Sequence, residues 1–208
     1  MLVTNQLTFD YSPTKQFVFP DVRCADREAL LILGRSGTGK TTLLHLLALL
    51  LRPKGGSVMI DQTDLAQLSP AQTASFRAEY IGIVYQKPHF IGALSVIDNL
   101  LLANYLANKP QQKKRALELA GQLGFGDQLT KQTYQLSQGE QQRVSIARAM
   151  MNQPGVILAD EPTSNLDDEN TDRVVSLLRE QSEQIGASLI VVTHDQRLKD
   201  VFQNRVFL

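Results

Sequence analysis

Short apolar runs alternate with amphipathic stretches along the chain, and this alternation sets the expected fold. Continuous apolar runs cover residues 30–33, 81–84, 156–159 and 189–192, and a further strand is expected at residues 7–11. Runs without polar alternation are typical of parallel strands buried on both faces. Helical patterns lie at residues 41–51, 111–123, 138–151 and 171–184. Strands separated by helices in this way predict an α/β fold.

The stretch from residue 87 to residue 154 has a different pattern. It is rich in helical periodicity, contains breaks at Gly92, Pro110, Gly121, Gly124 and Gly126, and has no clear strand. We interpret it as a helical subdomain inserted into the α/β core. The chain is then a single domain over residues 1–208. Its core comprises residues 1–86 and 155–208, and its insert comprises residues 87–154.

Composition narrows the possible classes of function. The 208 residues are 43% apolar and 20% charged, which is ordinary for a globular domain. The 21 basic and 21 acidic side chains cancel, so we expect no nucleic-acid partner. Cys24 is the single cysteine, which excludes an intramolecular disulfide. The N-terminus lacks a signal-peptide pattern, and the longest apolar stretch, residues 43–51, is shorter than the ~20 residues of a membrane-spanning helix.

Residues 34–41 match the G-x-x-x-x-G-K-[ST] pattern of a phosphate-binding loop, with an apolar strand before it and an apolar helix after it. Glycines let the backbone wrap around phosphates, and the helix start adds its positive end. We expect Lys40 to reach the β- and γ-phosphates and the Thr41 hydroxyl to bind Mg²⁺. The nucleotide-binding residues predicted here are Gly34, Arg35, Ser36, Gly37, Thr38, Gly39, Lys40, Thr41 and Thr42.

Polar side chains follow three of the predicted strands. Asp160 and Glu161 come at the end of the strand at 156–159, Gln86 follows the strand at 81–84, and His194 follows the strand at 189–192. Parallel strands of an open sheet bind ligands at this carboxyl edge. An acidic pair alone is equally typical of a solvated turn. Beside a phosphate loop, we expect Asp160 to bind the metal, Glu161 to polarise an attacking water, and His194 to contact the γ-phosphate or hold that water.

These features together resemble the ATP-binding subunits of ABC transporters over essentially the whole chain. The decisive segment is Leu-Ser-Gln-Gly-Glu-Gln-Gln-Arg at residues 136–143, which is similar to the family signature LSGGQ-x-QR. Gln86 matches the glutamine loop, residues 164–167 match the D-loop, and His194 matches the switch histidine. The resemblance implies a P-loop NTPase (RecA-like) core with an inserted α-helical subdomain and an N-terminal antiparallel β region. It also implies ATP and Mg²⁺, and a place for Gln86 in both metal binding and catalysis.

The family works as a dimer, with ATP held between the Lys40 of one subunit and the signature of the other. The resemblance therefore implies that Ser137, Gly139 and Asp167 contact nucleotide across a dimer. Ser137 and Glu140 also fit a capping box that opens a helix, and such a helix start is an anion site. The chain departs from the signature at Gln138, which replaces a glycine, and at Glu140, which replaces the glutamine.

An aromatic side chain that stacks on adenine is also implied by the resemblance. Tyr11, on the early strand at residues 7–11, is the main candidate. Phe9, Phe17 and Phe19 are the alternatives, and packing in the core or at a sheet edge is the competing interpretation of each.

The amino-acid sequences of several stretches are similar to those of the lipoprotein-release and macrolide-efflux subgroup of the family, which includes the LolD, MacB and FtsE types. These stretches are residues 75–82, 158–167 and 192–195. The resemblance implies a second ATP-binding subunit, expected to be a copy of this chain, and an integral membrane permease. The protein would then lie on the cytoplasmic face of the cell membrane.

Apolar side chains after Gln86 offer surface to the permease or fill the subdomain core. They are Phe90, Ile91, Leu94, Val96 and Ile97. Two alternative functions stay open at this point: an FtsE-like regulator that signals through a membrane protein without transport, and a soluble ABC ATPase that acts on nucleic acid or ribosomes.

Overall fold

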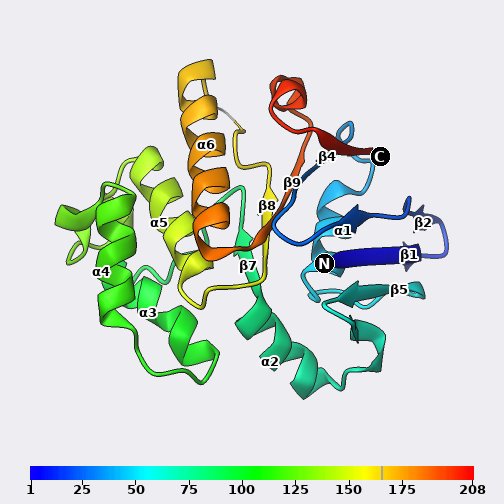
Figure 1. The fold of residues 1–208 in the computed structure, drawn as a ribbon, viewed down its shortest axis with the longest axis horizontal. Coiled ribbons are helices and arrows are strands. Elements are labelled where there is room, and N and C mark those ends of the chain that lie inside the picture. The colour runs from blue at the N-terminus through cyan, green and yellow to red at the C-terminus, as the bar shows by residue number, and fades with distance from the viewer. Residues whose placement is uncertain (165) are drawn as a thin grey trace.

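The computed structural model describes residues 1–164 and 166–208 and places two sheets and a helical region side by side (Figure 1). The first sheet is parallel, in the order β10-β4-β9-β8-β7. Its strands are β4 (Ala29–Leu33), β7 (Ile81–Val84), β8 (Val156–Asp160), β9 (Ser188–Thr193) and β10 (Asn204–Phe207). The four apolar runs predicted as parallel strands are confirmed as β4, β7, β8 and β9.

The second sheet is antiparallel and confirms the β region expected near the N-terminus. It has the order β2-β1-β5-β6, with β3 also paired to β1. Its strands are β1 (Leu2–Ser12), β2 (Lys15–Val18), β3 (Arg23–Cys24), β5 (Gly55–Ile60) and β6 (Thr63–Asp64). The strand expected at residues 7–11 is thus the second half of β1.

Successive residues of the parallel strands face two different cores, because side chains alternate across a sheet. Leu31, Leu33, Leu189 and Val191 pack with the helical region on one face, while Leu30, Ile32, Ile190 and Val192 pack with α1 and the antiparallel sheet on the other. Burial on both faces explains why these strands are continuous apolar runs. Figure 1 shows α6 on one side of the strands and α1 on the other.

The helices follow most of the predicted patterns. They are α1 (Lys40–Leu47), α2 (Pro70–Tyr80), α3 (Val96–Leu106), α4 (Lys113–Gln122), α5 (Gln138–Met150) and α6 (Asp168–Ile185), with short 3₁₀ turns η1 (Leu65–Gln67), η2 (Gly126–Gln128), η3 (Thr133–Gln135) and η4 (Gln196–Asp200). The helix expected at residues 41–51 ends earlier than predicted. Leu49 lies at φ 57°, in the left-handed region, and the N–H groups of Leu50 and Leu51 both donate to the His45 carbonyl, which turns the chain.

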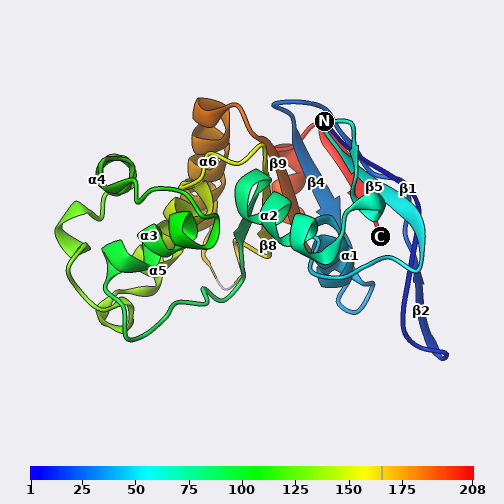
Figure 2. The same cartoon turned by 90° about the horizontal axis from the view of Figure 1, so that it is seen from below.

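Two helices, α2 and α3, were not among the predicted helices. In α2 no residue is buried, so the helix has no apolar stripe from which to recognise it. Its signal is local: Ser69 caps the helix in a reciprocal capping box with Gln72, and Pro70 occupies the first helical position. In Figure 2 this helix lies between the helical region and the β-rich part of the molecule.

Residues 87–154 contain α3, α4, α5, η2 and η3 and no strand, within the part of the chain that the structure describes. They form a helical lobe beside the parallel sheet (Figure 2). The division of the chain into a core and an insert at residues 86/87 and 154/155 stays a prediction. None of the helices in the described ranges combines the length and apolar character that crossing a bilayer needs.

Asn152 joins the helical lobe to α2 through side-chain hydrogen bonds. Its Nδ2 donates to the carbonyl oxygens of Ala78 in α2 and Ala103 in α3, each at 2.9 Å. Its Oδ1 accepts from Nδ2 of the buried Asn104 at 2.8 Å. Buried amides of this kind are costly when their partners are removed.

We expect Asn152→Ala to lower the free energy of unfolding by about 2–3 kcal/mol, because it leaves two carbonyls and the Asn104 amide without their partner. Urea unfolding followed by circular dichroism measures this change. Gln122→Ala, at an exposed residue that ends α4, is the matched control and is expected to change stability by less than about 0.5 kcal/mol. Equal stability of the two variants would contradict the role assigned to Asn152.

Candidate functional site

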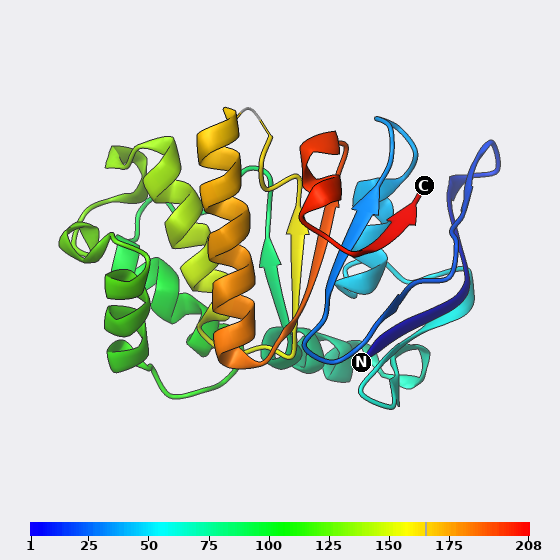
Figure 3. The same cartoon turned by 45° about the horizontal axis from the view of Figure 1, so that its top comes forward.

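The phosphate loop joins β4 to α1 at the carboxyl edge of the parallel sheet. In Figure 3 the parallel strands point toward the loops that follow them, and these loops gather at one edge of the sheet. Gly37 and Gly39 adopt left-handed conformations with φ 86° and 95°, which favour glycine. A Cβ on Gly39 would come within 2.7 Å of the Phe17 ring. The loop conformation therefore requires glycine at this position for two independent reasons.

Lys40 is almost fully buried at the first turn of α1, with 7% of its surface exposed. Its Nζ donates to the Arg35 carbonyl at 3.0 Å and lies 3.5 Å from Oε1 of Glu161. The Thr38 hydroxyl donates to the same carbonyl at 2.9 Å, which closes the loop on itself. The loop thus holds one buried cation beside one buried carboxylate, an arrangement in which phosphates can compete for the lysine.

Thr41 and Asp160 meet across the gap between α1 and β8. The Thr41 hydroxyl donates to Oδ2 of Asp160 at 3.3 Å. Burial raises the pKa of Asp160 above its usual range, although the Thr41 hydrogen bond opposes that shift. Oδ1 of Asp160 is buried and has no hydrogen-bond partner among the described residues. A buried carboxylate oxygen without a partner, next to a threonine hydroxyl, fits the oxygen donor set of Mg²⁺.

A metal at this point would depend on few protein ligands. Residues 1–164 and 166–208 contain no cluster of three or more His, Cys, Asp or Glu side chains suited to hold an ion. Thr41, Asp160 and Gln86 supply only hydroxyl, carboxylate and amide oxygens. Mg²⁺ commonly takes one or two protein ligands and completes its shell with water and substrate phosphates, so this small set suits a nucleotide-bound magnesium.

Glu161 is held by donors from β9 and the loop after it. Oε2 accepts from the Thr193 hydroxyl at 2.7 Å and from the His194 N–H at 3.2 Å, and Nδ1 of His194 lies 2.9 Å from both carboxylate oxygens. Burial alone would raise the pKa of Glu161, but the hydrogen bonds from His194 and Thr193 outweigh it and lower that pKa. A carboxylate only accepts, so Nδ1 of His194 carries the proton of this bond.

All of these side chains except Thr38, Asp160 and Thr193 line one cavity of about 440 Å³, and Asp160 is joined to its wall by the hydrogen bond from Thr41. The predicted residues that line it are Ser36, Gly37, Gly39, Lys40, Thr41, Thr42, Gln86, Glu161 and His194. Lys15 and Phe17, from β2, line it as well. Lys15 was not singled out from the sequence, since its place depends on how the β1–β2 hairpin folds over the phosphate loop. Gly34, Arg35 and Thr38 belong to the loop but not to the cavity wall.

Tyr11 lies beside this cavity rather than on its wall. Its side chain is 53% exposed, its hydroxyl is 3.2 Å from Oγ1 of Thr42, and Nζ of Lys15 lies 5.3 Å from its ring centroid. Among the alternatives, Phe9 packs edge-on against Tyr11, Phe19 is buried, and Phe17 lines the cavity. The stacking role of Tyr11 stays a prediction, and Phe17 is the aromatic side chain that faces the cavity directly.

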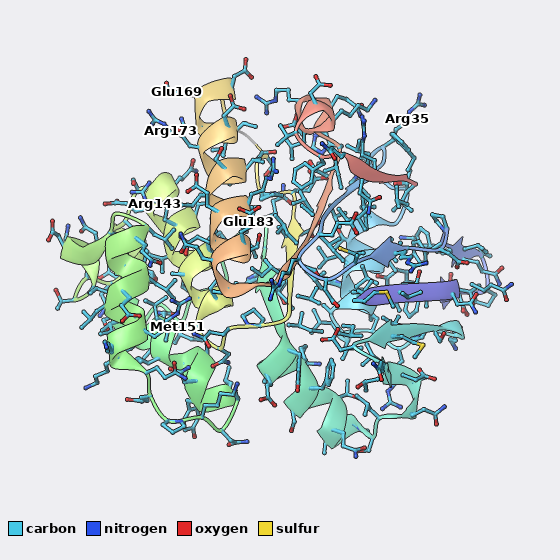
Figure 4. The ribbon with its side chains drawn as sticks, in the orientation of Figure 1. Arg35, Arg143, Met151, Glu169, Arg173 and Glu183 are labelled. Atoms are coloured by element: carbon cyan, nitrogen blue, oxygen red, sulfur yellow. The ribbon has the colours of Figure 1, made fainter. Side chains whose placement is uncertain are left out.

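The signature residues are built as a helix cap. Ser137 caps α5, and its N–H and hydroxyl donate to Oε2 of Glu140 at 2.8 and 2.7 Å. These bonds lower the pKa of the exposed Glu140 carboxyl. Ser137 and Gly139 do not line the 440 Å³ cavity. Figure 4 places Arg143 of α5 and Arg35 of the phosphate loop on opposite sides of the molecule.

The D-loop lies between Glu161 and α6, and Asn165 in it lies outside the described residues. Asp167 caps α6 by accepting from the Asn170 N–H at 2.8 Å, and it does not line the cavity. One chain therefore brings together its phosphate loop, Gln86, Asp160, Glu161 and His194, but leaves Ser137, Gly139 and Asp167 apart from them.

Comparison with known proteins agrees with this geometry. The family model described as ABC transporter matches residues 20–164. The lipoprotein-releasing system ATP-binding protein LolD of Shewanella frigidimarina is 42% identical over 173 residues, which are 82% of this chain and 72% of that protein. The macrolide export ATP-binding/permease protein MacB of Vibrio parahaemolyticus is 41% identical over 181 residues, which are 86% of this chain but 27% of that protein.

Solved structures of ABC cassettes share the whole fold. A dimeric structure of MJ0796, described as a bacterial ABC transporter cassette, has a TM-score of 0.89 at 30% identity and covers 100% of this chain and 94% of its own. The dimeric post-hydrolysis state of the same cassette, bound to ADP and phosphate, has a TM-score of 0.87 at 29% identity, with the same coverage. This chain therefore belongs to the ABC transporter family and is an ATP-binding, ATP-hydrolysing subunit of a transporter.

Proposed function

We propose that this chain drives a separate membrane permease of the export or lipoprotein-release kind, as a homodimer on the cytoplasmic face of the cell membrane. The observation that carries the catalytic part is the convergence of Lys40, Glu161 and His194 on one cavity beside the phosphate loop. The relatives named LolD and MacB support the subgroup, since they are 42% and 41% identical to this chain over 82% and 86% of its length.

The hydrolytic step follows from the charges in the cavity. The γ-phosphate of ATP attracts Lys40 away from Glu161, which frees Oε1 of that carboxylate. Glu161 then accepts a proton from the water that attacks the γ-phosphorus, while the bond from phosphorus to the ADP oxygen breaks. His194 stays hydrogen-bonded to Glu161 through Nδ1 and lines the same cavity. Thr41, Asp160 and Gln86 would hold Mg²⁺, which would neutralise phosphate charge when bound.

We expect Glu161→Gln to lower ATP turnover by at least about a hundredfold, because the amide cannot accept the proton of the attacking water. Dimers that form with ATP should persist, since the phosphate-binding groups are unchanged. Phosphate release measures turnover, and light scattering with and without ATP measures dimer formation. Glu118→Gln, at an exposed residue of α4, is the matched control. Wild-type turnover in Glu161→Gln would remove Glu161 from this role.

The dimer completes the site. Within one chain the signature at the start of α5 does not reach the cavity, whereas a two-fold symmetric pair can place the Ser137 of one copy against the ATP held by the other. The solved cassettes with the same fold are described as dimers, which supports this arrangement. Removing ATP by hydrolysis then removes the ligand that joins the two copies.

A mixing experiment tests the shared site. Lys40→Ala and Ser137→Ala should each be inactive as homodimers, but a mixed dimer contains one site that has both residues. An equal mixture is expected to recover up to about a quarter of the wild-type sites, because half of the dimers are mixed and each has one intact site. Phosphate release from the mixture measures the recovery. A mixture that forms dimers and yet stays inactive would contradict a site shared between copies.

The permease is expected to contact the start of the helical lobe. Ile91 is 49% exposed there, while Val96 is fully buried, and Phe90 and Ile97 pack partly against the core. The apolar residues after Gln86 are thus divided between surface and core, and Ile91 is the one that offers most of its side chain to a partner.

Affinity capture of the tagged protein from detergent-solubilised membranes, followed by mass spectrometry, tests the membrane partner. We expect a permease with few transmembrane helices and a large extracytoplasmic domain, and we expect Ile91→Asp to reduce its recovery relative to Leu117→Asp, an exposed residue of α4. Recovery of ribosomes or nucleic-acid proteins alone would overturn the assignment to a membrane transporter while leaving the ATPase intact.

A further inference from the structure

Thr193 contacts Glu161 but does not line the cavity that Glu161 lines. It is the last residue of β9 and is fully buried. Its hydroxyl donates to Oε2 of Glu161 at 2.7 Å, while Oε1 of the same carboxylate lies 3.5 Å from Nζ of Lys40. Nδ1 of His194 lies 2.9 Å from both oxygens of Glu161, but their other neighbours differ. The Thr193 hydroxyl and the His194 N–H donate to Oε2, whereas Lys40 lies beside Oε1.

The polarity of this hydrogen bond is fixed by Asp195. The Asp195 N–H donates to Oγ1 of Thr193 at 3.0 Å. A threonine hydroxyl has one proton, and with this N–H already directed at its oxygen, that proton is given to Glu161. Thr193 is thus a permanent donor to the carboxylate rather than a hydroxyl that can rotate away.

Asp195 is itself held by two neighbouring segments. Its Oδ2 accepts from the Thr163 hydroxyl at 3.0 Å and from Nη2 of Arg197 at 2.7 Å, and its Oδ1 accepts from Nε of Arg197 at 2.9 Å. Nη1 of Arg197 continues to Oδ1 of Asp168 at 2.5 Å, at the start of α6. The backbone that aims Thr193 is therefore fixed to the segment that follows Glu161.

Glu161 needs such support because its own backbone is strained. It lies at φ 46°, a left-handed conformation that is unfavourable for a non-glycine residue. Its N–H donates to the Val192 carbonyl at 2.8 Å, so both its backbone and its side chain are held by the end of β9. Strained residues persist where surrounding contacts over-determine them, as they do here.

We propose that Thr193 is a positioning residue for ATP hydrolysis: its buried hydroxyl, fixed by the Asp195 N–H, holds Oε2 of Glu161 so that Oε1 is presented to the cavity. The proposal rests on the role of Glu161 in the proposed function. The catalytic contact belongs to Glu161, and Thr193 acts through it. Phosphate binding belongs to the loop and Lys40, and Thr193 contacts the loop through its backbone carbonyl, which accepts from the Gly34 N–H at 3.3 Å and is unchanged by a side-chain substitution.

The test compares Thr193→Val with Thr193→Ser. Valine keeps the shape of threonine without the hydroxyl, whereas serine keeps the hydroxyl without the methyl group. We expect Thr193→Val to lower kcat by about tenfold to a hundredfold, the range for losing a hydrogen bond to a charged group, with KM for ATP unchanged. Thr193→Ser should restore kcat to within about threefold of the wild type. A packing role would give the opposite order, with valine tolerated and serine impaired.

Thr171→Val is the matched control. Thr171 is a buried threonine in α6, and its hydroxyl has no hydrogen-bond partner among the residues that the structure describes. This variant loses a buried hydroxyl as Thr193→Val does, and it should keep wild-type kcat. Thermal unfolding and binding of a fluorescent ATP analogue monitor folding. If Thr193→Val does not fold, Thr193→Cys replaces it, because a thiol is only a weak donor.

The outcomes separate this proposal from the proposed function. Unchanged kcat in Thr193→Val, or serine impaired as much as valine, overturns the positioning role while an inactive Glu161→Gln leaves the catalytic role of Glu161 standing. Wild-type turnover in Glu161→Gln removes the catalytic role, and the positioning role is overturned with it. A selective loss of kcat in Thr193→Val, restored by serine, supports both.

Discussion

The parallel register of β4, β9 and β8 is the constraint on which the site depends. Leu33 of β4 pairs with Thr193 of β9, and Asp160 of β8 pairs with Val192, so the three strands end at the same level. The phosphate loop, the acidic pair and the switch histidine begin where those strands end. A strand displaced by one residue would also turn its side chains to the opposite face, which the two separate cores forbid.

Two adjacent carboxyl groups have different properties because they contact different elements: Asp160 accepts from Thr41 of α1, whereas Glu161 accepts from Thr193 of β9 and from His194. Burial dominates at Asp160 and raises its pKa, whereas the donors from β9 dominate at Glu161 and lower its pKa. The first carboxyl keeps an oxygen without a partner, which suits a cation, and the second is kept ionised, which suits acceptance of a proton. The different roles expected of Asp160 and Glu161 thus follow from the different elements that they contact.

The sequence predicted correctly those parts of the molecule that leave a local pattern, either a continuous run of buried apolar residues or a motif of specific residue types. Four strands of the parallel sheet, β4, β7, β8 and β9, were recognisable because both of their faces are buried, whereas the edge strand β10, with exposed positions alternating along it, was not predicted. The phosphate loop was recognisable from its glycines and Lys40, which match a specific pattern. Helix α2 was missed because it buries no side chain. Lys15 and Thr193 were missed for a different reason. Each lies beside residues far along the chain, and no local pattern records such neighbours. Lys15 shares a cavity with the phosphate loop, Glu161 and His194, and Thr193 donates to Glu161.

The amide of Asn152 gives the helical lobe a mechanical connection to the sheet besides the covalent one. Helix α2 leads into β7, and β7 leads to Gln86, after which the chain enters the lobe. Since Asn152 ties α3 to the last turn of α2, the lobe is attached near both ends of β7. A displacement of α3 would therefore reach β7 at both of its ends, and Gln86, two residues after the strand, would be displaced with it.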